Sequence, residues 1–353
     1  MRRFGDHPER GDVLFVIVRS SLEAILATGQ PVLADGATGT NYFGMGLEAG
    51  EPPELWNVEH PERVQELHRA FVNAGADIIL TNTFGGNRHR LKLHGNEGRV
   101  FELNQAAARL AREVADAAPR PVVVAGSVGP TGELFAPLGA LTEDDALEVF
   151  TEQIEGLMAG GADVAWIETM SATEEIRAAA HAAIAVGIPY TATASFDTAG
   201  RTMMGLHPES FAAVFAGLDP PPLAIGANCG VGASDILVTL LAMAGAHHDP
   251  RLISKGNCGV PQFRGAEIVY SGTPALMGEY ARLAVDGGAA IIGGCCGTSP
   301  DHLREMRAAL DSHAAGAPPT TEQIVERIGP LANLAPEDPA DHAARTRGRN
   351  RVR

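Results

Sequence analysis

The chain has 353 residues, of which 45% are hydrophobic and 20% are charged, and its formal net charge at pH 7 is −16. The acidic balance argues against nucleic acid and anionic membranes as partners. With only four cysteines, the chain is not a disulfide scaffold, and reduced thiols in the cytoplasm are expected. The apolar run at residues 14–18 is too short for an export signal or a membrane span.

Short β-branched or apolar runs alternate with longer helical patterns along the chain. This alternation predicts a parallel sheet built from βα units. The strand candidates are residues 31–35, 77–81, 121–127, 163–168, 190–196, 223–228, 252–257 and 289–294. Helical patterns lie between several of them, at 61–73, 97–117, 142–159, 173–186 and 274–286. Eight such units predict an α/β fold, a (β/α)8 TIM barrel.

An open, doubly wound sheet is the rival fold, but no Gly-x-Gly-x-x-Gly follows the first strand, so a dinucleotide site has no support. We expect the barrel and its N-terminal lead-in to occupy residues 1–314. Residues 315–353 then form a C-terminal extension. It begins with an amphipathic helix over 320–328, able to dock on the barrel or on a second subunit of a homo-oligomer, and ends in a disordered tail carrying arginines from Arg345 to Arg353.

Polar residues gather where the predicted strands end, which is where this fold places its active site. Among them are all four cysteines, three of which could lie close together. Cys229 ends the sixth strand, and Cys295 and Cys296 follow the eighth, so only the seventh strand separates them. The other polar positions at strand ends include Asp35, Thr83, Ser127, Glu168, Asn228 and Cys258.

Each cysteine taken alone is expected to be an inert, buried side chain, and their clustering is the evidence against that interpretation. Three thiolates with an open fourth position favour a catalytic Zn²⁺ site that binds and activates an incoming thiol. Cys258 could be a fourth ligand, a spare thiol or a packed side chain, and we favour the last two. A zinc hydrolase would need histidine-rich ligands, and the 12 histidines do not form His-x-His at a strand end.

Residues 28–312 resemble the homocysteine S-methyltransferase family, whose members are zinc-dependent barrel enzymes. The strongest part of the resemblance is Gly-Gly-Cys-Cys-Gly-Thr at 293–298 together with Asn228-Cys229. Weaker motifs add to it, namely Asp-Gly-Ala-Thr-Gly-Thr at 35–40, Glu-His-Pro at 59–61, Thr-Asn-Thr-Phe at 81–84, Gly-Ser-Val-Gly-Pro at 126–130 and Glu168-Thr169.

The resemblance implies a role for each matching position. Cys229, Cys295 and Cys296 would hold zinc, and the sulfur of homocysteine would take the fourth place. Asp35 and Glu168 match the acidic positions that bind the amino group of homocysteine. Further substrate contacts are expected from Gly36, Ser127, Asn228 and Thr83.

The methyl donor is expected to be an onium compound, with betaine as the first choice because this chain is most similar to bacterial members of the betaine type. Trp56, Tyr42 and Phe84, with Phe43, lie in loops that could cage a quaternary nitrogen, although Trp56 could instead pack below the barrel mouth. S-methylmethionine, S-adenosylmethionine and dimethylsulfoniopropionate are alternative donors. A further alternative is a partner-dependent module that receives its methyl group from a separate corrinoid protein.

Overall fold

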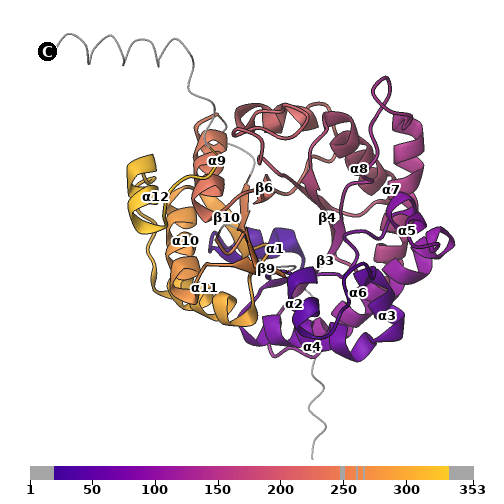
Figure 1. The fold of residues 1–353 in the computed structure, drawn as a ribbon, viewed down its shortest axis with the longest axis horizontal. Helices are drawn as coiled ribbons and strands as arrows, with labels where there is room; N and C mark the ends of the chain where they lie inside the picture. The colour runs from indigo at the N-terminus through magenta and orange to yellow at the C-terminus, as the bar shows by residue number, and fades with distance from the viewer. Residues whose placement is uncertain (1–19, 247–250, 260, 265–266, 334–353) are drawn as a thin grey trace, which may run out of the picture.

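The computed structural model describes residues 20–246, 251–259, 261–264 and 267–333. The apolar run at 14–18 and the arginine-rich segment from 345 to 353 lie outside this part of the chain. Within it, the central feature is a ring of parallel strands surrounded by helices (Figure 1). The predicted fold class is therefore confirmed.

Eight parallel strands form one sheet. They are β1 (Val32–Leu33), β2 (Ile78–Leu80), β3 (Val123–Val128), β4 (Val164–Met170), β5 (Tyr190–Ala194), β6 (Ile225–Cys229), β7 (Leu252–Gly256) and β10 (Ala289–Gly294). Their spatial order is β1-β10-β7-β6-β5-β4-β3-β2. A parallel bridge between Ala34 and Ile78 joins the two outer strands, so the sheet closes into a barrel.

Helices follow the strands around the outside of the barrel (Figure 1). After β1 come α2 (Gly39–Gly44), η1 (Pro53–Leu55), α3 (Trp56–Glu59) and α4 (Pro61–Asn73); after β2 come α5 (Arg88–Lys92), η2 (Glu97–Arg99) and α6 (Val100–Asp116). Single elements follow the next strands: α7 (Glu143–Gly160), α8 (Thr173–Val186), η3 (Pro208–Phe215), α9 (Ala233–Ala246), α10 (Pro274–Asp286) and α11 (Pro300–Ser312).

Apolar side chains form two separate layers. The larger lies between the strands and the outer helices. The smaller fills the barrel interior with inward-facing residues of the strands, among them Val32 and Trp166. The short helix α1 (Leu22–Leu26) adds Leu22 and Leu26 to this inner layer, and Figure 1 shows α1 within the ring of strands. The interior is thus a packed core, and the carboxyl ends of the strands remain for the site.

Two segments depart from the simple barrel pattern. The element after β5 is the 3₁₀ helix η3 rather than an α-helix. Between β7 and α10, the chain forms an antiparallel hairpin of β8 (Pro261–Arg264) and β9 (Glu267–Tyr270), which the sequence analysis missed. This hairpin ends at Tyr270, whose ring packs against Gly297 beside the paired cysteines.

The predicted helix of the C-terminal extension is present as α12 (Thr321–Arg327). Thr320 caps it, and the fully buried Ile324 belongs to the outer apolar layer. Arg327 pairs with Glu279 of α10, and the carbonyl of Gly329 accepts a hydrogen bond from Ser234 of α9. The extension therefore packs on the barrel of its own chain. No helix in the described ranges is long and apolar enough to cross a membrane.

Candidate active site at the carboxyl end of the barrel

Three cysteines meet at the carboxyl end of the barrel. Cys229 is the last residue of β6, and Cys295 and Cys296 directly follow β10. Their sulfur atoms all lie within 4.8 Å of one another. Tetrahedral zinc with metal–sulfur distances of about 2.3 Å needs sulfurs about 3.8 Å apart, so the three cysteines fit such an ion. The structure thus brings together the predicted metal ligands.

The glycines around the paired cysteines are required by close packing. A Cβ atom at Gly294 would lie 2.2 Å from the side chain of Thr298, which is fully buried. Gly297 has a φ of +79°, and a Cβ there would lie 2.3 Å from the ring of Tyr270. The tight turn after β10 is what places Cys295 and Cys296 toward the same side as Cys229.

Asn228, the residue before Cys229, forms hydrogen bonds that hold the ends of neighbouring strands together. Its Oδ1 accepts hydrogen bonds from the backbone N–H of Thr169 at 2.8 Å and from the hydroxyl of Thr193 at 2.7 Å, and its Nδ2 donates to the Thr169 hydroxyl at 2.7 Å. Thr169 and Cys229 both have a φ near +60°, a left-handed conformation that costs a non-glycine residue roughly 1–2 kcal/mol. The predicted substrate contact Asn228 is thus occupied in holding these two strained strand ends and does not line the cavity.

Asn257 joins the two halves of the cysteine cluster. Its Nδ2 donates to the carbonyl of Gly230 at 2.9 Å, and its Oδ1 accepts from the backbone N–H of Cys296 at 3.0 Å. Asn257 ends the predicted seventh strand, and no local pattern in the sequence indicates its role at the cysteines. Tyr270 was not predicted either, and its hydroxyl helps to lower the pKa of Cys296.

Hydrogen bonding among the three thiols shifts the pKa of each of them. Hydrogen bonding with Cys229 and Cys295 lowers the pKa of Cys296 to about 3, whereas hydrogen bonding with Cys295 and Cys296 raises the pKa of Cys229. A thiol with a lowered pKa ionises more readily, and the thiolate is the form that binds a metal cation. Cys258 is fully buried outside this cluster, and burial raises its pKa to about 11, as expected for a packed thiol.

Asp35 forms a buried ion pair that the sequence analysis did not anticipate. Its Oδ2 accepts the backbone N–H of Leu80 at 2.7 Å, and its Oδ1 pairs with Nζ of Lys255 at 2.9 Å. Lys255 lies on β7 and is only 2% exposed. Period-two alternation with the inward-facing Ile253 was the signal in the sequence that could have placed Lys255 inside the barrel.

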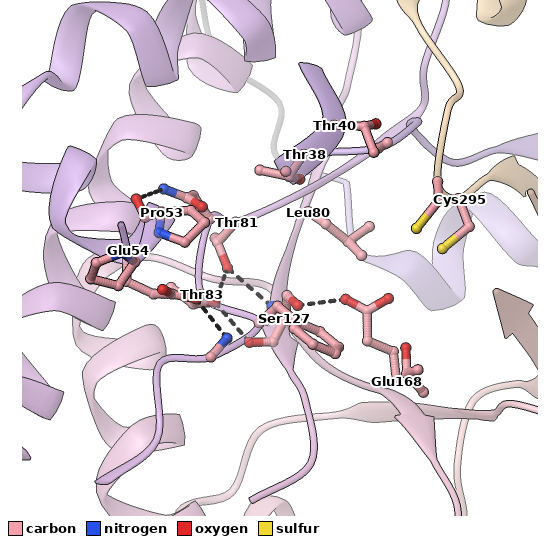
Figure 2. A pocket seen from close by; sticks show the side chains of 18 of the residues that line it. Thr38, Thr40, Pro53, Glu54, Leu80, Thr81, Thr83, Ser127, Glu168 and Cys295 are labelled. Carbon is pink, nitrogen blue, oxygen red and sulfur yellow. Dashed lines mark hydrogen bonds between the residues drawn. The ribbon is translucent and has the colours of Figure 1, made fainter. Parts of the chain in front are cut away.

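Glu168, on β4, points into the space between Ser127 and the cysteines (Figure 2). One of its oxygens accepts a hydrogen bond from the Ser127 hydroxyl at 2.5 Å. Burial raises the pKa of Glu168 to about 7, against the opposing effect of Lys255. A cationic group that enters the cavity would favour the ionised form of Glu168, and the resulting carboxylate would bind that group.

A cavity of about 550 Å³ opens in front of these residues, large enough for two small molecules. Its inner end is lined by Gly36, Thr83, Ser127, Glu168, Lys255 and the three cysteines. The hydroxyl of Thr83 donates to the carbonyl of Ser127 at 2.7 Å and so braces the wall. Asp35 does not line the cavity and lies behind Lys255.

The outer arm of the cavity is built by the loops after β1 and β2. Its lining includes Phe43, Glu54, Phe84, Arg90 and His94. Phe43 and Phe84 are 56% and 41% exposed. The carboxylate of Glu54 accepts the backbone N–H of Gly85 at 2.6 Å, and burial raises its pKa.

The prediction that Trp56 and Tyr42 belong to an aromatic cage in the cavity is wrong. Trp56 is 3% exposed and Tyr42 is fully buried, and their rings pack against each other with centroids 5.1 Å apart. Neither lines the cavity. Trp56 begins α3, and its ring packs against Tyr42 of α2 and Arg63 of α4, which agrees with the alternative that Trp56 is a packing residue. Phe84, with Phe43, is the part of the predicted cage that reaches the cavity.

Comparison with known proteins agrees with this geometry. The homocysteine S-methyltransferase family model matches residues 32–310. The chain belongs to this family. It is therefore a methyltransferase, and its three-cysteine cluster lies at the carboxyl ends of the strands within the matched region.

Individual relatives fit the same family. Methionine synthase of Mycobacterium leprae is 30% identical over 313 residues, which is 83% of this chain but 25% of that protein, so the chain spans about a quarter of its length. The oxidized form of the homocysteine methyltransferase MmuM from Escherichia coli is 25% identical, with a TM-score of 0.67 over 79% of this chain and 95% of that one. The metallated form of MmuM has a TM-score of 0.68 at 24% identity, covering 81% and 98% of the two chains.

Proposed function

We propose that the protein transfers a methyl group from betaine to homocysteine and forms methionine and dimethylglycine. The observation that carries this proposal is the cluster of three thiols at the end of a cavity whose inner wall holds a buried carboxylate, Glu168. Cys229, Cys295 and Cys296 would hold Zn²⁺, which supplies a position where a substrate thiol is bound as its thiolate. Thiols kept reduced for this role fit a cytoplasmic location.

The residues of the chain bind and align the thiol substrate. The carboxylate of Glu168 pairs with the α-ammonium group of homocysteine, and the Ser127 hydroxyl keeps that carboxylate turned toward the cysteines. The backbone of Gly36 lies in the same wall. Held at this end, the substrate directs its sulfur toward the cysteine cluster.

The donor is aligned from the outer arm. Phe84 and Phe43 present aromatic faces to a quaternary nitrogen, and the guanidinium of Arg90 is available to the carboxylate of betaine. The electron pair of the homocysteine thiolate forms the new S–CH₃ bond as the C–N bond of betaine breaks and its electrons remain on nitrogen. Alignment in a dry pocket is the main contribution of the protein, and no general base is required.

A second candidate is a module that receives its methyl group from a corrinoid partner. It is favoured by the 30% identity to methionine synthase over 83% of this chain. Large apolar side chains are also exposed on the loops after β3 and β5, which follow the carboxyl ends of these strands, and Leu138 and Met203 there are each 71% exposed. A donor-bearing domain could cover such a surface.

One assay separates these candidates. Zinc-loaded protein is incubated with homocysteine and each of betaine, S-methylmethionine, S-adenosylmethionine and dimethylsulfoniopropionate, without any corrinoid, and methionine and the demethylated donor are quantified. Equal amounts of methionine and dimethylglycine from betaine would support the main proposal. Methionine from one of the sulfonium donors alone would replace betaine. Methionine formed only after addition of a methylated corrinoid would support the partner-dependent module instead.

A further inference from the structure

The inner end of the cavity presents one anionic and one cationic side chain. Glu168 supplies the carboxylate and Lys255 the ammonium group, and the charge of Lys255 is close enough to lower the pKa of Glu168. Among the described residues that line the cavity, Arg90 and His94 are the other basic side chains, and both belong to the outer arm. The inner end therefore matches a molecule that carries both charges.

Lys255 is held in place by two contacts, and a neighbouring glycine leaves room for its stem. Its ammonium group lies 2.9 Å from Oδ1 of Asp35 and 5.7 Å from the centre of the Trp166 ring. A Cβ atom at Gly293 would lie 3.0 Å from Cγ of Lys255, so the absence of a side chain at Gly293 leaves room for the lysine stem. A buried ammonium group is costly unless it is paired, and here Asp35 pairs it from behind while the cavity remains in front.

We propose that Lys255 binds the α-carboxylate of homocysteine while Glu168 binds its α-ammonium group, an inference that rests on the function proposed above. Asp35, which was expected to bind the amino group, is instead a positioning residue that holds Lys255. Both of its oxygens are already engaged, one with Leu80 and one with Lys255. Lys255 thereby becomes a specificity-determining residue that selects amino-acid thiols over simple thiols.

The selectivity follows from desolvation. A carboxylate that enters a buried pocket loses its hydration and needs a charged partner there. A thiol without the carboxylate forms no ion pair with Lys255. Removing the lysine should therefore weaken binding of homocysteine but leave binding of a carboxylate-free analogue nearly unchanged.

The test measures binding of three thiols to zinc-loaded protein by calorimetry: homocysteine, 3-mercaptopropylamine, which lacks the carboxylate, and 4-mercaptobutanoate, which lacks the amino group. In Lys255→Met we expect the Kd for homocysteine to rise roughly 10- to 100-fold and the Kd for 3-mercaptopropylamine to change less than about threefold. Zinc content, measured on the same samples, should stay at one ion per chain.

Control variants distinguish a specific loss of carboxylate binding from a general loss of folding. The chain has two lysines, Lys92 and Lys255, so Lys92→Met on the exposed face of α5 is the natural control and should bind all three thiols as the wild type does. The double variant Asp35→Asn with Lys255→Met removes both buried charges and should show the same selective loss. With lysine labelled at its ε-carbon, a ¹³C spectrum has two lysine signals, and homocysteine should shift the signal that Lys92→Met retains.

The outcomes separate the two proposals. Equal weakening of homocysteine and 3-mercaptopropylamine in both Lys255 variants would overturn the role of Lys255 and leave the proposed function standing. Failure of the wild-type, zinc-loaded protein to bind homocysteine at all would overturn both. A selective loss for homocysteine, with the lysine signal shifting on binding, is the result that supports the inference.

Discussion

The two ends of the cavity are built in different ways. At the inner end, the polar groups of Asp35, Glu168 and Lys255 are buried and engaged in hydrogen bonds or ion pairs within the barrel. In the outer arm, Phe43 and Arg90 lie on the short helices α2 and α5, Phe84 and His94 lie on loops, and all four side chains are exposed. The inner end, where we propose that the thiol binds, is therefore held by the strands of the barrel, whereas the proposed donor end is built from loops and short helices, which tolerate sequence change more readily.

The largest effect should come from the cysteine cluster at the inner end. Replacing Cys296 with alanine leaves two thiolates, which cannot complete a catalytic three-ligand site. We expect zinc retention to be lost and methionine formation to fall by roughly 1000-fold or more. Zinc content and initial rate, measured on the same dialysed sample, check this prediction.

Cys258 provides the control for that variant. It is buried outside the cluster, so Cys258→Ala should keep its zinc and most of its activity, with a loss of stability of about 1 kcal/mol. Full zinc and full turnover in Cys296→Ala would mean that the metal is held elsewhere.

The next effect concerns pH. Because burial raises the pKa of Glu168 to about 7, this carboxyl is protonated in the empty cavity below pH 7 and must lose its proton to bind an ammonium group. The Kd for homocysteine should therefore increase as pH falls from 7 to 5, approaching a tenfold increase per pH unit from this group.

The substrate thiol also loses a proton on binding zinc, which adds to the slope in the same direction. Measuring 4-mercaptobutanoate in parallel removes this contribution, because it has the thiol without the amino group. If both thiols show the same pH slope, Glu168 does not bind the ammonium group.

A smaller effect is expected from the residue that links the two cysteine segments. Asn257→Ala removes the hydrogen bonds to Gly230 and to the backbone N–H of Cys296 but no metal ligand. Supporting residues of this kind typically change metal affinity by roughly 10-fold or more. Competition with a zinc chelator should show a correspondingly weaker site, and an unchanged affinity would assign Asn257 to folding alone.

The smallest effect should lie in the outer arm. Arg90 is exposed, so a charge pair with a donor carboxylate is partly screened by water. Arg90→Ala should raise the KM for betaine by roughly twofold to fivefold and leave the KM for homocysteine unchanged. The neighbouring Arg88, which pairs with Glu152, gives a matched control, Arg88→Ala. An effect on homocysteine equal to that on betaine would place Arg90 outside the donor site.

The barrel and the cysteine cluster were predictable because their signals are local. Each strand is a short apolar run, and Gly-Gly-Cys-Cys-Gly follows such a run at the strand end. Lys255 was missed because one lysine in a strand is usually read as a surface residue, and its pairing with Asp35 joins strands 220 positions apart. Trp56 and Tyr42 were wrongly expected in the cavity because the direction of a loop side chain depends on tertiary packing that no local pattern reveals.

The most direct test of the account asks what fills the fourth position beside the three cysteines. X-ray absorption at the zinc edge is measured on zinc-loaded protein before and after addition of selenohomocysteine. If the three cysteines hold zinc and the substrate takes the fourth position, zinc in the loaded protein has three sulfur neighbours, and the added substrate contributes one selenium neighbour while these three remain. A zinc environment that gains no selenium, with turnover intact, would contradict the account.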